Sequence, residues 1–206
     1  MSDEQRLEFF CTAQCKGLSD QKLQETVVGL LKESRVNHVL GCAEAAYQLA
    51  KRWGADPRDA WRAGMLHDVT KALSEQAQLQ LCQRMGLPTD AFQQQNPKIL
   101  HQLTGAEVAR RVFGENEAVC LAIRTHTTGS AGMNTLQKII YVADYMEPNR
   151  DFDGVDALRE LADKDLDRAM QMGLEMTVAL LQKQGRAVCD DSVAALRDLK
   201  KENVKC

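Results

Sequence analysis

The chain has 206 residues, enough to bury a hydrophobic core in one large or two small domains. Its 26 basic and 29 acidic residues are interspersed and leave a formal net charge of -3, so no basic field exists that could hold long DNA or RNA. No apolar leader follows the start and no run of about eighteen apolar residues occurs, so we expect a cytoplasmic protein without membrane contact.

The seven cysteines are spread along the chain and contain no C-x-x-C pair. Their odd number and wide spacing argue against a disulfide framework or a zinc knuckle. We therefore expect reduced thiols that mostly serve as small core residues.

Apolar residues recur with helical spacing throughout, and the alternation typical of strands is missing, which predicts an all-α protein. We expect a helical bundle that forms a single compact domain. The first helix is expected to begin at Ser19 or Asp20. Residues 1–18 are therefore interpreted as an added N-terminal arm, and 19–206 as the domain, with the C-terminal helices packed on it.

Caps and breakers mark the next helices. A long helix is expected over about 34–53, and Asp56 followed by Pro57 begins another that leads to His67 and Asp68. Ser74 begins the following helix, which should stop at Gly86. The polar stretch 86–96 is read as an irregular loop, in the position of a lid over a site.

Thr104 and Glu107 have the spacing of a capping box, which predicts a helix from Thr104 to the residue before Gly114. This assignment leaves His101 in the loop ahead of that helix. The remaining helices are expected over about 116–126, 135–146, 154–184 and 191–203.

Several residues able to bind a metal fall on apolar helix faces. His38 continues an apolar face of its helix, and His67 follows small residues that allow a second helix to approach closely. His126 and Asp144 also continue apolar stripes. These four side chains are therefore expected to point inward.

Burying histidines and carboxylates without partners would cost several kcal/mol, and a shared metal ion would offset that cost. Imidazole and carboxylate ligands suit iron, manganese, cobalt or zinc, and the lack of cysteine in the set disfavours a structural zinc site. From spacing and helix face alone, a hydrogen-bonded core without metal is an equally good alternative.

Three stretches make the pattern more specific: Gly-Met-Leu-His-Asp-Val-Thr-Lys at 64–71, Thr-His-Thr-Thr-Gly at 125–129, and Lys-Ile-Ile-Tyr-Val-Ala-Asp-Tyr-Met-Glu-Pro-Asn-Arg at 138–150. With His38 before them, the order of a histidine, a His-Asp pair and a distant aspartate resembles the HD superfamily of metal-dependent phosphohydrolases. Together the stretches resemble its YqeK branch, bacterial proteins that hydrolyse diadenosine tetraphosphate symmetrically into two ADP. The resemblance covers about residues 33–200.

The resemblance implies a divalent transition metal, with iron as the first candidate, held by His38, His67, Asp68 and Asp144. His101 and His126 would then face the phosphates or hold a second metal bridged by Asp68, and both roles are left open. The implied catalytic residues are Asp68, Lys71, His101 and His126. The implied substrate contacts are Arg35, His38, Lys71, Ser74, His101, His126, Tyr145, Arg150, Asp190 and Ser192.

The implied partner is a dinucleoside polyphosphate or an ADP-like nucleotide, and the sequence leaves a homodimer open. One alternative is another HD-type nucleotide phosphohydrolase or phosphatase. A second alternative, from a different class, is a nucleotide-binding sensor with little turnover. A purely structural helical scaffold is least favoured, because it leaves the inward histidines and aspartates unexplained.

Overall fold

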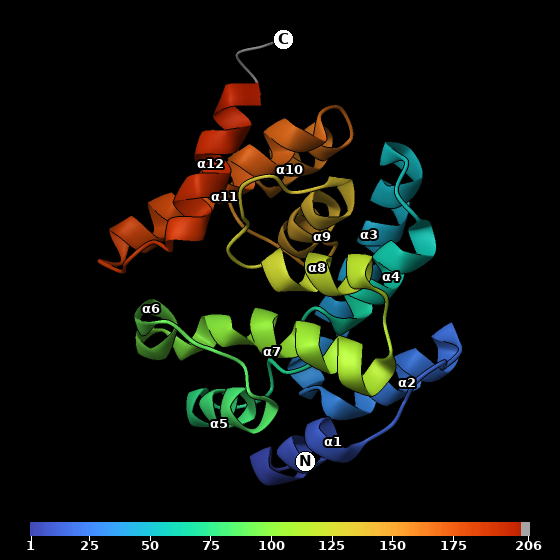
Figure 1. Cartoon of the computed structure of the whole chain (residues 1–206). Helices are drawn as coiled ribbons and strands as arrows, with labels where there is room; N and C mark the ends of the chain where they lie inside the picture. Colours follow the sequence, from blue (N-terminus) through green and yellow to red (C-terminus); the bar gives the residue numbers. More distant parts are fainter. Residues whose placement is uncertain (203–206) are drawn as a thin grey trace.

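The computed structural model describes residues 1–202, and these residues form helices, turns and loops without a strand. The prediction of an all-α protein is therefore confirmed (Figure 1). The helices are α1 (Asp3–Thr12), α2 (Asp20–Leu30), α3 (Glu33–Trp53), α4 (Pro57–Leu66), α5 (Glu75–Met85), α6 (Ala91–Gln95), α7 (Leu100–Val108), α8 (Glu117–Thr125), α9 (Thr135–Met146), α10 (Val155–Ala162), α11 (Leu166–Lys183) and α12 (Asp190–Glu202).

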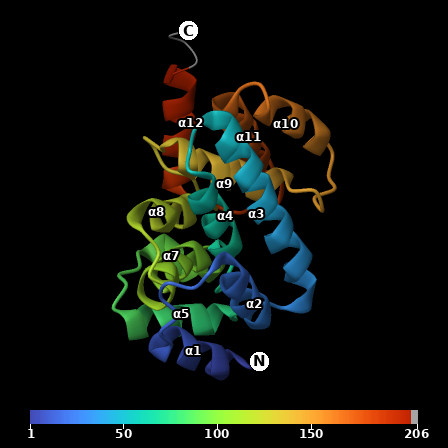
Figure 2. The ribbon, with the colours of Figure 1, turned by 90° about the vertical axis from the view of Figure 1, so that its right-hand side faces the viewer.

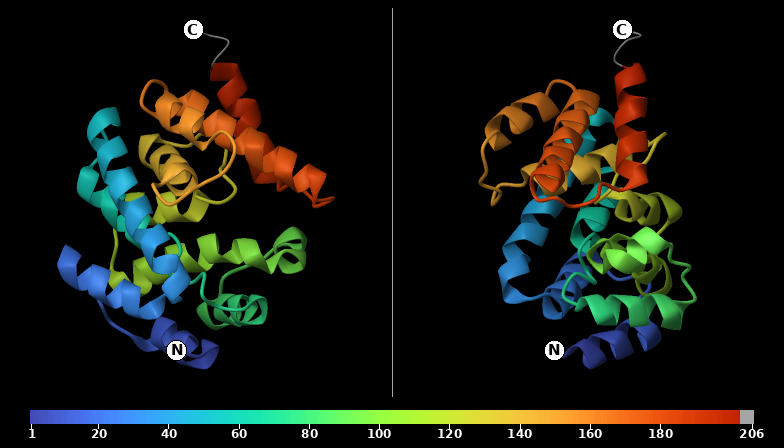
Figure 3. Two further views of the ribbon diagram at one scale, coloured as in Figure 1. Left: turned by 180° about the vertical axis from the view of Figure 1, so that it is seen from behind. Right: turned by 90° about the vertical axis from the view of Figure 1, so that its left-hand side faces the viewer.

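Four helices form the centre of the bundle, because α3, α4, α8 and α9 pack against one another. Helices α1, α2, α5 and α7 lie on one side of this centre and α10 to α12 on the other (Figures 1 and 2). The longest helix, α3, runs between the two groups, as Figure 3 shows from behind. This arrangement places the ends of several helices at one point in the middle of the molecule.

The crossing of α3 and α4 is unusually close because Gly64 lies at the contact. A Cβ atom at Gly64 would lie only 2.6 Å from the Cα atom of Ala43. Asp56 accepts hydrogen bonds from the backbone N–H groups of Arg58 and Asp59 at 2.8 and 2.9 Å and fixes where α4 begins, as predicted. The helix then ends at Leu66, so the next two residues of the chain stand beside α3.

The predicted position of His101 is wrong. Helix α7 begins at Leu100, after a 3-10 turn over Pro97–Ile99, so His101 is helical and not part of a loop. Thr104 does not cap this helix, because its hydroxyl is buried and bonded to Gln78 Oε1 at 2.7 Å. The side chain that the sequence pattern identified as a helix cap therefore forms a tertiary hydrogen bond instead.

The long helix expected over 154–184 is also wrong, since the structure has α10 and α11 with a break between them. Asp165 caps the second of the two, accepting from the backbone N–H of Arg168 at 3.0 Å. The stretch 86–96 contains the short helix α6 rather than only irregular loop.

Residues 1–18 contain a helix that the sequence did not predict. Helix α1 begins with a capping box between Ser2 and Gln5 and buries Leu7 and Phe10 in the main core. Where the N-terminal arm ends and the domain begins stays a prediction.

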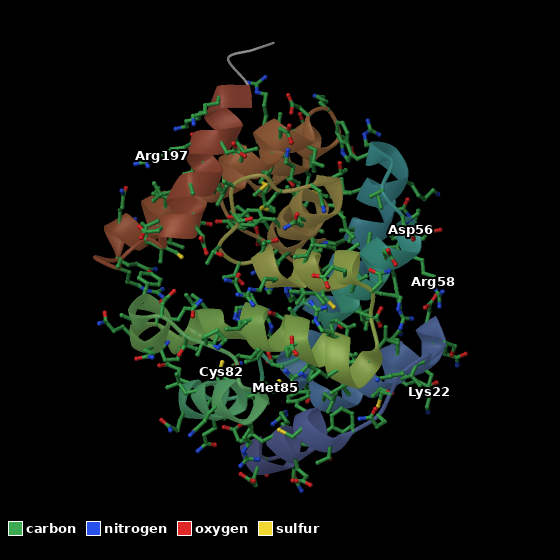
Figure 4. All side chains as sticks on the ribbon, in the orientation of Figure 1. Lys22, Asp56, Arg58, Cys82, Met85 and Arg197 are labelled. Carbon is green, nitrogen blue, oxygen red and sulfur yellow. The ribbon has the colours of Figure 1, made fainter. Side chains whose placement is uncertain are left out.

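The outer faces of the helices are polar. Lys22 and Arg58, for example, project from the rim of the molecule (Figure 4). The six cysteines among the described residues are free, and Cys206 lies outside them. Within residues 1–202, no helix combines the length and apolar character needed to cross a membrane.

The Gly64 contact generates a test of the central crossing. We expect Gly64→Ala to lower the free energy of unfolding by about 1–3 kcal/mol, because the added methyl forces α3 and α4 apart. Gly29→Ala in α2 is the matched control: nothing lies within 4 Å of a Cβ there, so it should raise stability by about 0.5–1 kcal/mol. Urea unfolding curves measure both, and equal changes in the two variants would contradict the interpretation.

Candidate metal centre

Two imidazoles and two carboxylates meet where α3, α4 and α9 converge. His38 Nε2 lies 3.2 Å from His67 Nε2, 3.7 Å from Asp68 Oδ2 and 3.1 Å from Asp144 Oδ1. His67 Nε2 lies 3.6 Å from the same oxygen of Asp68 and 3.8 Å from that of Asp144. Three of these side chains are buried, and that of Asp144 is 20% exposed. The four residues predicted as ligands are thus brought together.

The spacing of the two imidazoles from each other and from the two carboxylates fits ligands of one transition-metal ion. Two ligand atoms bound at about 2.1 Å to a tetrahedral or octahedral ion are roughly 3.0 to 3.4 Å apart. The observed separations of 3.1 to 3.8 Å are close to that range. The donor set of nitrogen and oxygen without sulfur suits a divalent transition metal.

The histidine tautomers are also those that a metal needs. The Nδ1 atoms of His67, His101 and His126 lie 2.6, 2.6 and 2.7 Å from backbone carbonyl oxygens. A carbonyl oxygen can only accept, so each Nδ1 must carry the hydrogen and donate it. Each Nε2 then presents its lone pair to the centre of the cluster.

Burial keeps these imidazoles neutral. It is the main cause that lowers the pKa of His126 to about 4 and holds the pKa values of His67 and His101 well below the usual value. Burial opposes ionisation of Asp144, but the positive charge of Arg150 helps to hold its pKa well below the usual value. Neutral imidazole and ionised carboxylate are the forms that bind metals.

Asp68 faces two groups of side chains with its two oxygens. Oδ2 points to His38, His67 and the guanidinium of Arg35, with which it forms an ion pair. Oδ1 lies 3.4 Å from His101 Nε2 and 3.7 Å from His126 Nε2. This second oxygen is buried without a hydrogen bond in the described structure, so it has unused capacity to bind a ligand.

Three cationic side chains surround the cluster. Besides Arg35, Arg150 donates to Asp144 Oδ1 at 2.7 Å, and Lys71 Nζ lies 2.8 Å from His101 Nε2. Burial lowers the pKa of Lys71 to about 8, so the amine still carries its positive charge at neutral pH. The surroundings therefore favour an anionic ligand.

An aromatic pocket of about 570 Å³ opens on one side of the cluster, and we call it the tyrosine pocket. The rings of Tyr141 and Tyr145 stack with centroids 6.2 Å apart, and Phe152 stands edge-on to Tyr145. The lining residues are Lys71, His126, Thr127, Tyr141, Asp144, Tyr145, Arg150, Phe152, Asp153, Met176, Thr177 and Leu180. The stacked rings give the pocket an apolar wall, and the lining reaches the cluster at Asp144.

A second pocket of about 220 Å³, which we call the α6 pocket, opens beside His101. Phe92 and Asn96 from α6 and its end line it, together with Ser192 at the start of α12. The two pockets share Lys71, Thr127 and Thr177. They therefore meet beside the cluster of histidines and aspartates, where His126 lines one pocket and His101 the other.

Not all predicted substrate contacts lie in these pockets. Ser74 lines neither and caps α5 beside α1, where its backbone N–H donates to Asp3 Oδ2 at 3.1 Å. Asp190 is exposed at the start of α12 and also lines neither pocket. Ser192 does line the α6 pocket, but its hydroxyl is already donated to the Thr128 carbonyl at 2.7 Å.

Sequence reasoning missed Glu147, whose side chain is buried and bonded to His38 Nδ1 at 3.1 Å. A glutamate directly before Pro148 at the end of a helix suits an exposed capping residue as readily as a partner for Arg150, so the local sequence does not point to His38. It also missed Phe92 and Phe152, which no local pattern separates from ordinary core aromatics. Their roles depend on which helices lie together.

Comparison with known proteins agrees with this geometry. Residues 35–149 match the family model described as the HD domain. The chain is similar to bis(5'-nucleosyl)-tetraphosphatase, symmetrical, of Bacillus subtilis (39% identity, covering 79% of this chain and 87% of the relative) and of Halalkalibacterium halodurans (37% identity, 82% and 90%). It also resembles a crystal structure from Clostridium acetobutylicum described as a predicted HD superfamily hydrolase involved in NAD metabolism, with a TM-score of 0.86, 35% identity, and coverage of 90% of this chain and 98% of that one.

The pKa of His126 predicts how metal-free protein responds to acid. Between pH 6.5 and about 4 the unfolded chain binds a proton at His126 that the folded chain does not, so stability is lost as pH falls through this window. In His126→Gln the slope of the unfolding free energy against pH should be smaller in this window, by the equivalent of about one bound proton. Urea unfolding at several pH values between 7 and 4 measures it, and identical pH slopes for variant and wild type would contradict the assignment.

Proposed function

Because this chain belongs to the HD-domain family, we propose that it hydrolyses diadenosine tetraphosphate, and related dinucleoside tetraphosphates, symmetrically into two ADP. The observation that carries the proposal is the pair of pockets that meet beside the cluster of histidines and aspartates. A dinucleotide with a pocket for each nucleoside has the middle of its phosphate chain at that meeting point. Cleavage there gives two equal halves.

The resident group that we propose is a divalent transition metal at His38, His67, Asp68 and Asp144, with iron first and manganese, cobalt and zinc as the other ions that suit these ligands. When bound, such an ion lowers the pKa of a coordinated water towards ~7 and polarises a phosphoryl oxygen. Asp68 Oδ1, His101 and His126 would face the phosphates and can also hold a second ion. The buried unpartnered oxygen of Asp68 supports this arrangement.

The side chains around the cluster supply the rest of the chemistry. We assign Arg35, Lys71 and Arg150 to the phosphate chain, where their charge stabilises the transferred phosphoryl group and the leaving ADP. Asp68 Oδ1 accepts a hydrogen bond from the attacking water and so directs its oxygen at phosphorus. The phosphorus–oxygen bond to the departing half breaks, and its electron pair leaves with the ADP oxygen.

The proton of the water needs an acceptor in the same place. The lone pair of His101 Nε2, 3.4 Å from Asp68 Oδ1, can take it, with His126 Nε2 beside it at 3.1 Å. A bound polyphosphate raises the proton affinity of both nitrogens through its negative charge. The proton then passes to the leaving ADP, which balances the reaction of one water with one substrate to two ADP.

The tyrosine pocket and the α6 pocket are assigned to the two nucleosides. Tyr145 and Phe152 offer aromatic surface to one base, and Phe92 offers it to the other. Tyr145 is thus retained as a substrate contact, together with Ser192 at the edge of the α6 pocket. Ser74 and Asp190 have no such support. A cytoplasmic location and a homodimer stay predictions.

The reaction is tested by product analysis of the metal-loaded protein. We expect ADP as the sole nucleotide product from diadenosine tetraphosphate, and loss of metal with an about 1,000-fold lower rate in Asp68→Asn, because the ion contributes several kcal/mol. The control is Asp163→Asn, which changes an exposed carboxylate and should keep both the bound metal and the wild-type rate. Formation of ATP and AMP would contradict symmetrical cleavage, and tight ADP binding without turnover in the metal-loaded wild type would favour the sensor.

The two-pocket arrangement is tested by variants on either side. Phe152→Ala and Phe92→Ala should each raise KM for diadenosine tetraphosphate by about 3- to 10-fold, since an aromatic contact contributes roughly 0.5–1.5 kcal/mol. The control is Leu121→Ala, an exposed apolar side chain outside both pockets, which should leave KM unchanged. An unchanged KM in either phenylalanine variant would remove that pocket from the proposal.

A further inference from the structure

The four imidazoles of the cluster are oriented in two different ways. His67 and His126 each donate Nδ1–H to the carbonyl three residues earlier, at Gly64 and Ile123. Both follow the last residue of a helix, where carbonyl oxygens have no partner within the helix. His101 does the same with Lys98, in the 3-10 turn ahead of α7.

His38 has no such carbonyl at its disposal. It lies within α3 (Glu33–Trp53), where the carbonyl oxygens accept the regular hydrogen bonds of the helix. Its Nδ1 instead lies 3.1 Å from Oε1 of Glu147, which comes from the residue following α9. His38 is thus the imidazole of the cluster whose orientation depends on another side chain.

Glu147 is itself held in place. Its side chain is 1% exposed, and Oε2 accepts from the backbone N–H and the Nδ2 atom of Asn149 at 2.7 and 2.8 Å. Gly41, one turn after His38, leaves the space that the carboxylate fills, since a Cβ there would lie 2.4 Å from Oε2. One oxygen is therefore fixed on Asn149, and the other is aimed at His38.

We propose that Glu147 is a positioning residue that holds His38 in the tautomer and ring orientation required to bind the metal. The inference rests on the metal site proposed above. Accepting the Nδ1 hydrogen leaves the lone pair on Nε2, which faces His67 and Asp144. A carboxylate also makes the imidazole a stronger ligand than a carbonyl does, because its full negative charge favours donation from the ring.

The geometry predicts what Glu147→Gln would do. Two donors from Asn149 point at the Oε2 position, so the glutamine oxygen must turn to them and its amide nitrogen must turn to His38. An N–H group facing Nδ1 favours the opposite tautomer, with the hydrogen on Nε2. That hydrogen would point at the metal position and oppose binding.

The test measures zinc affinity by chelator competition in wild type, Glu147→Gln, Asn149→Ala and Glu115→Gln. We expect about 10- to 100-fold weaker binding in Glu147→Gln and a smaller loss in Asn149→Ala, which keeps the carboxylate but removes one anchor. Glu115 is the matched control, since its largely buried carboxylate pairs with Arg62 away from the cluster, and its variant should bind zinc like wild type.

A second readout uses metal-free protein. Long-range proton–nitrogen NMR spectra should show the hydrogen of His38 on Nδ1 in wild type and on Nε2 in Glu147→Gln, with circular dichroism confirming that both are folded. An unchanged His38 tautomer in Glu147→Gln, or a zinc affinity within twofold of wild type, would overturn the inference. If Glu147→Gln does not fold, the zinc affinity of Asn149→Ala is the deciding measurement. Failure of wild type to bind zinc or any other transition metal would instead overturn the proposed metal site. The NMR spectra of metal-free protein would still test whether Glu147 sets the tautomer of His38.

Discussion

The structure depends on one electrostatic constraint: nitrogen and oxygen atoms that carry lone pairs or negative charge converge at a buried point and need a cation among them. Imidazole lone pairs from α3, α4, α7 and α8 and carboxylate oxygens from Asp68 and Asp144 face one another across distances between 3 and 4 Å. Lone pairs and negative charges at such distances repel unless a cation lies among them. Arg35 and Lys71 supply part of that charge, and the donor set fits a divalent transition metal for the rest.

The fold meets this constraint through where its helices end. Helices α4 and α8 stop at the cluster, so the free carbonyls of their last turns fix the tautomers of His67 and His126 without any additional side chain. The close crossing at Gly64 brings the end of α4 against α3. His38 lies mid-helix, so its orientation requires a partner from elsewhere, and Glu147 is in that position.

The two pockets also meet beside this point. Lys71, Thr127 and Thr177 border both pockets, so a ligand that spans them passes beside His126, which lines one pocket, and His101, which lines the other. Burial keeps the imidazoles of His67, His101 and His126 neutral, while Arg35, Lys71 and Arg150 place positive charge around them. The lone pairs and the positive charge are therefore carried by two different sets of side chains.

The sequence by itself determined the helical class, the start of α4 at Asp56 and Pro57, the inward faces of His38 and His67, and, through the family pattern, the four residues that the structure brings together. These depend on local caps, on helical periodicity or on a motif, all of which are written in short stretches of chain. Only the tertiary structure decided that Thr104 bonds to Gln78 instead of capping a helix, that α10 and α11 are separate, and that Glu147 is buried against His38. It alone showed that the two pockets meet beside the cluster. Such contacts join residues up to about a hundred positions apart, and no local pattern encodes which helices will lie side by side.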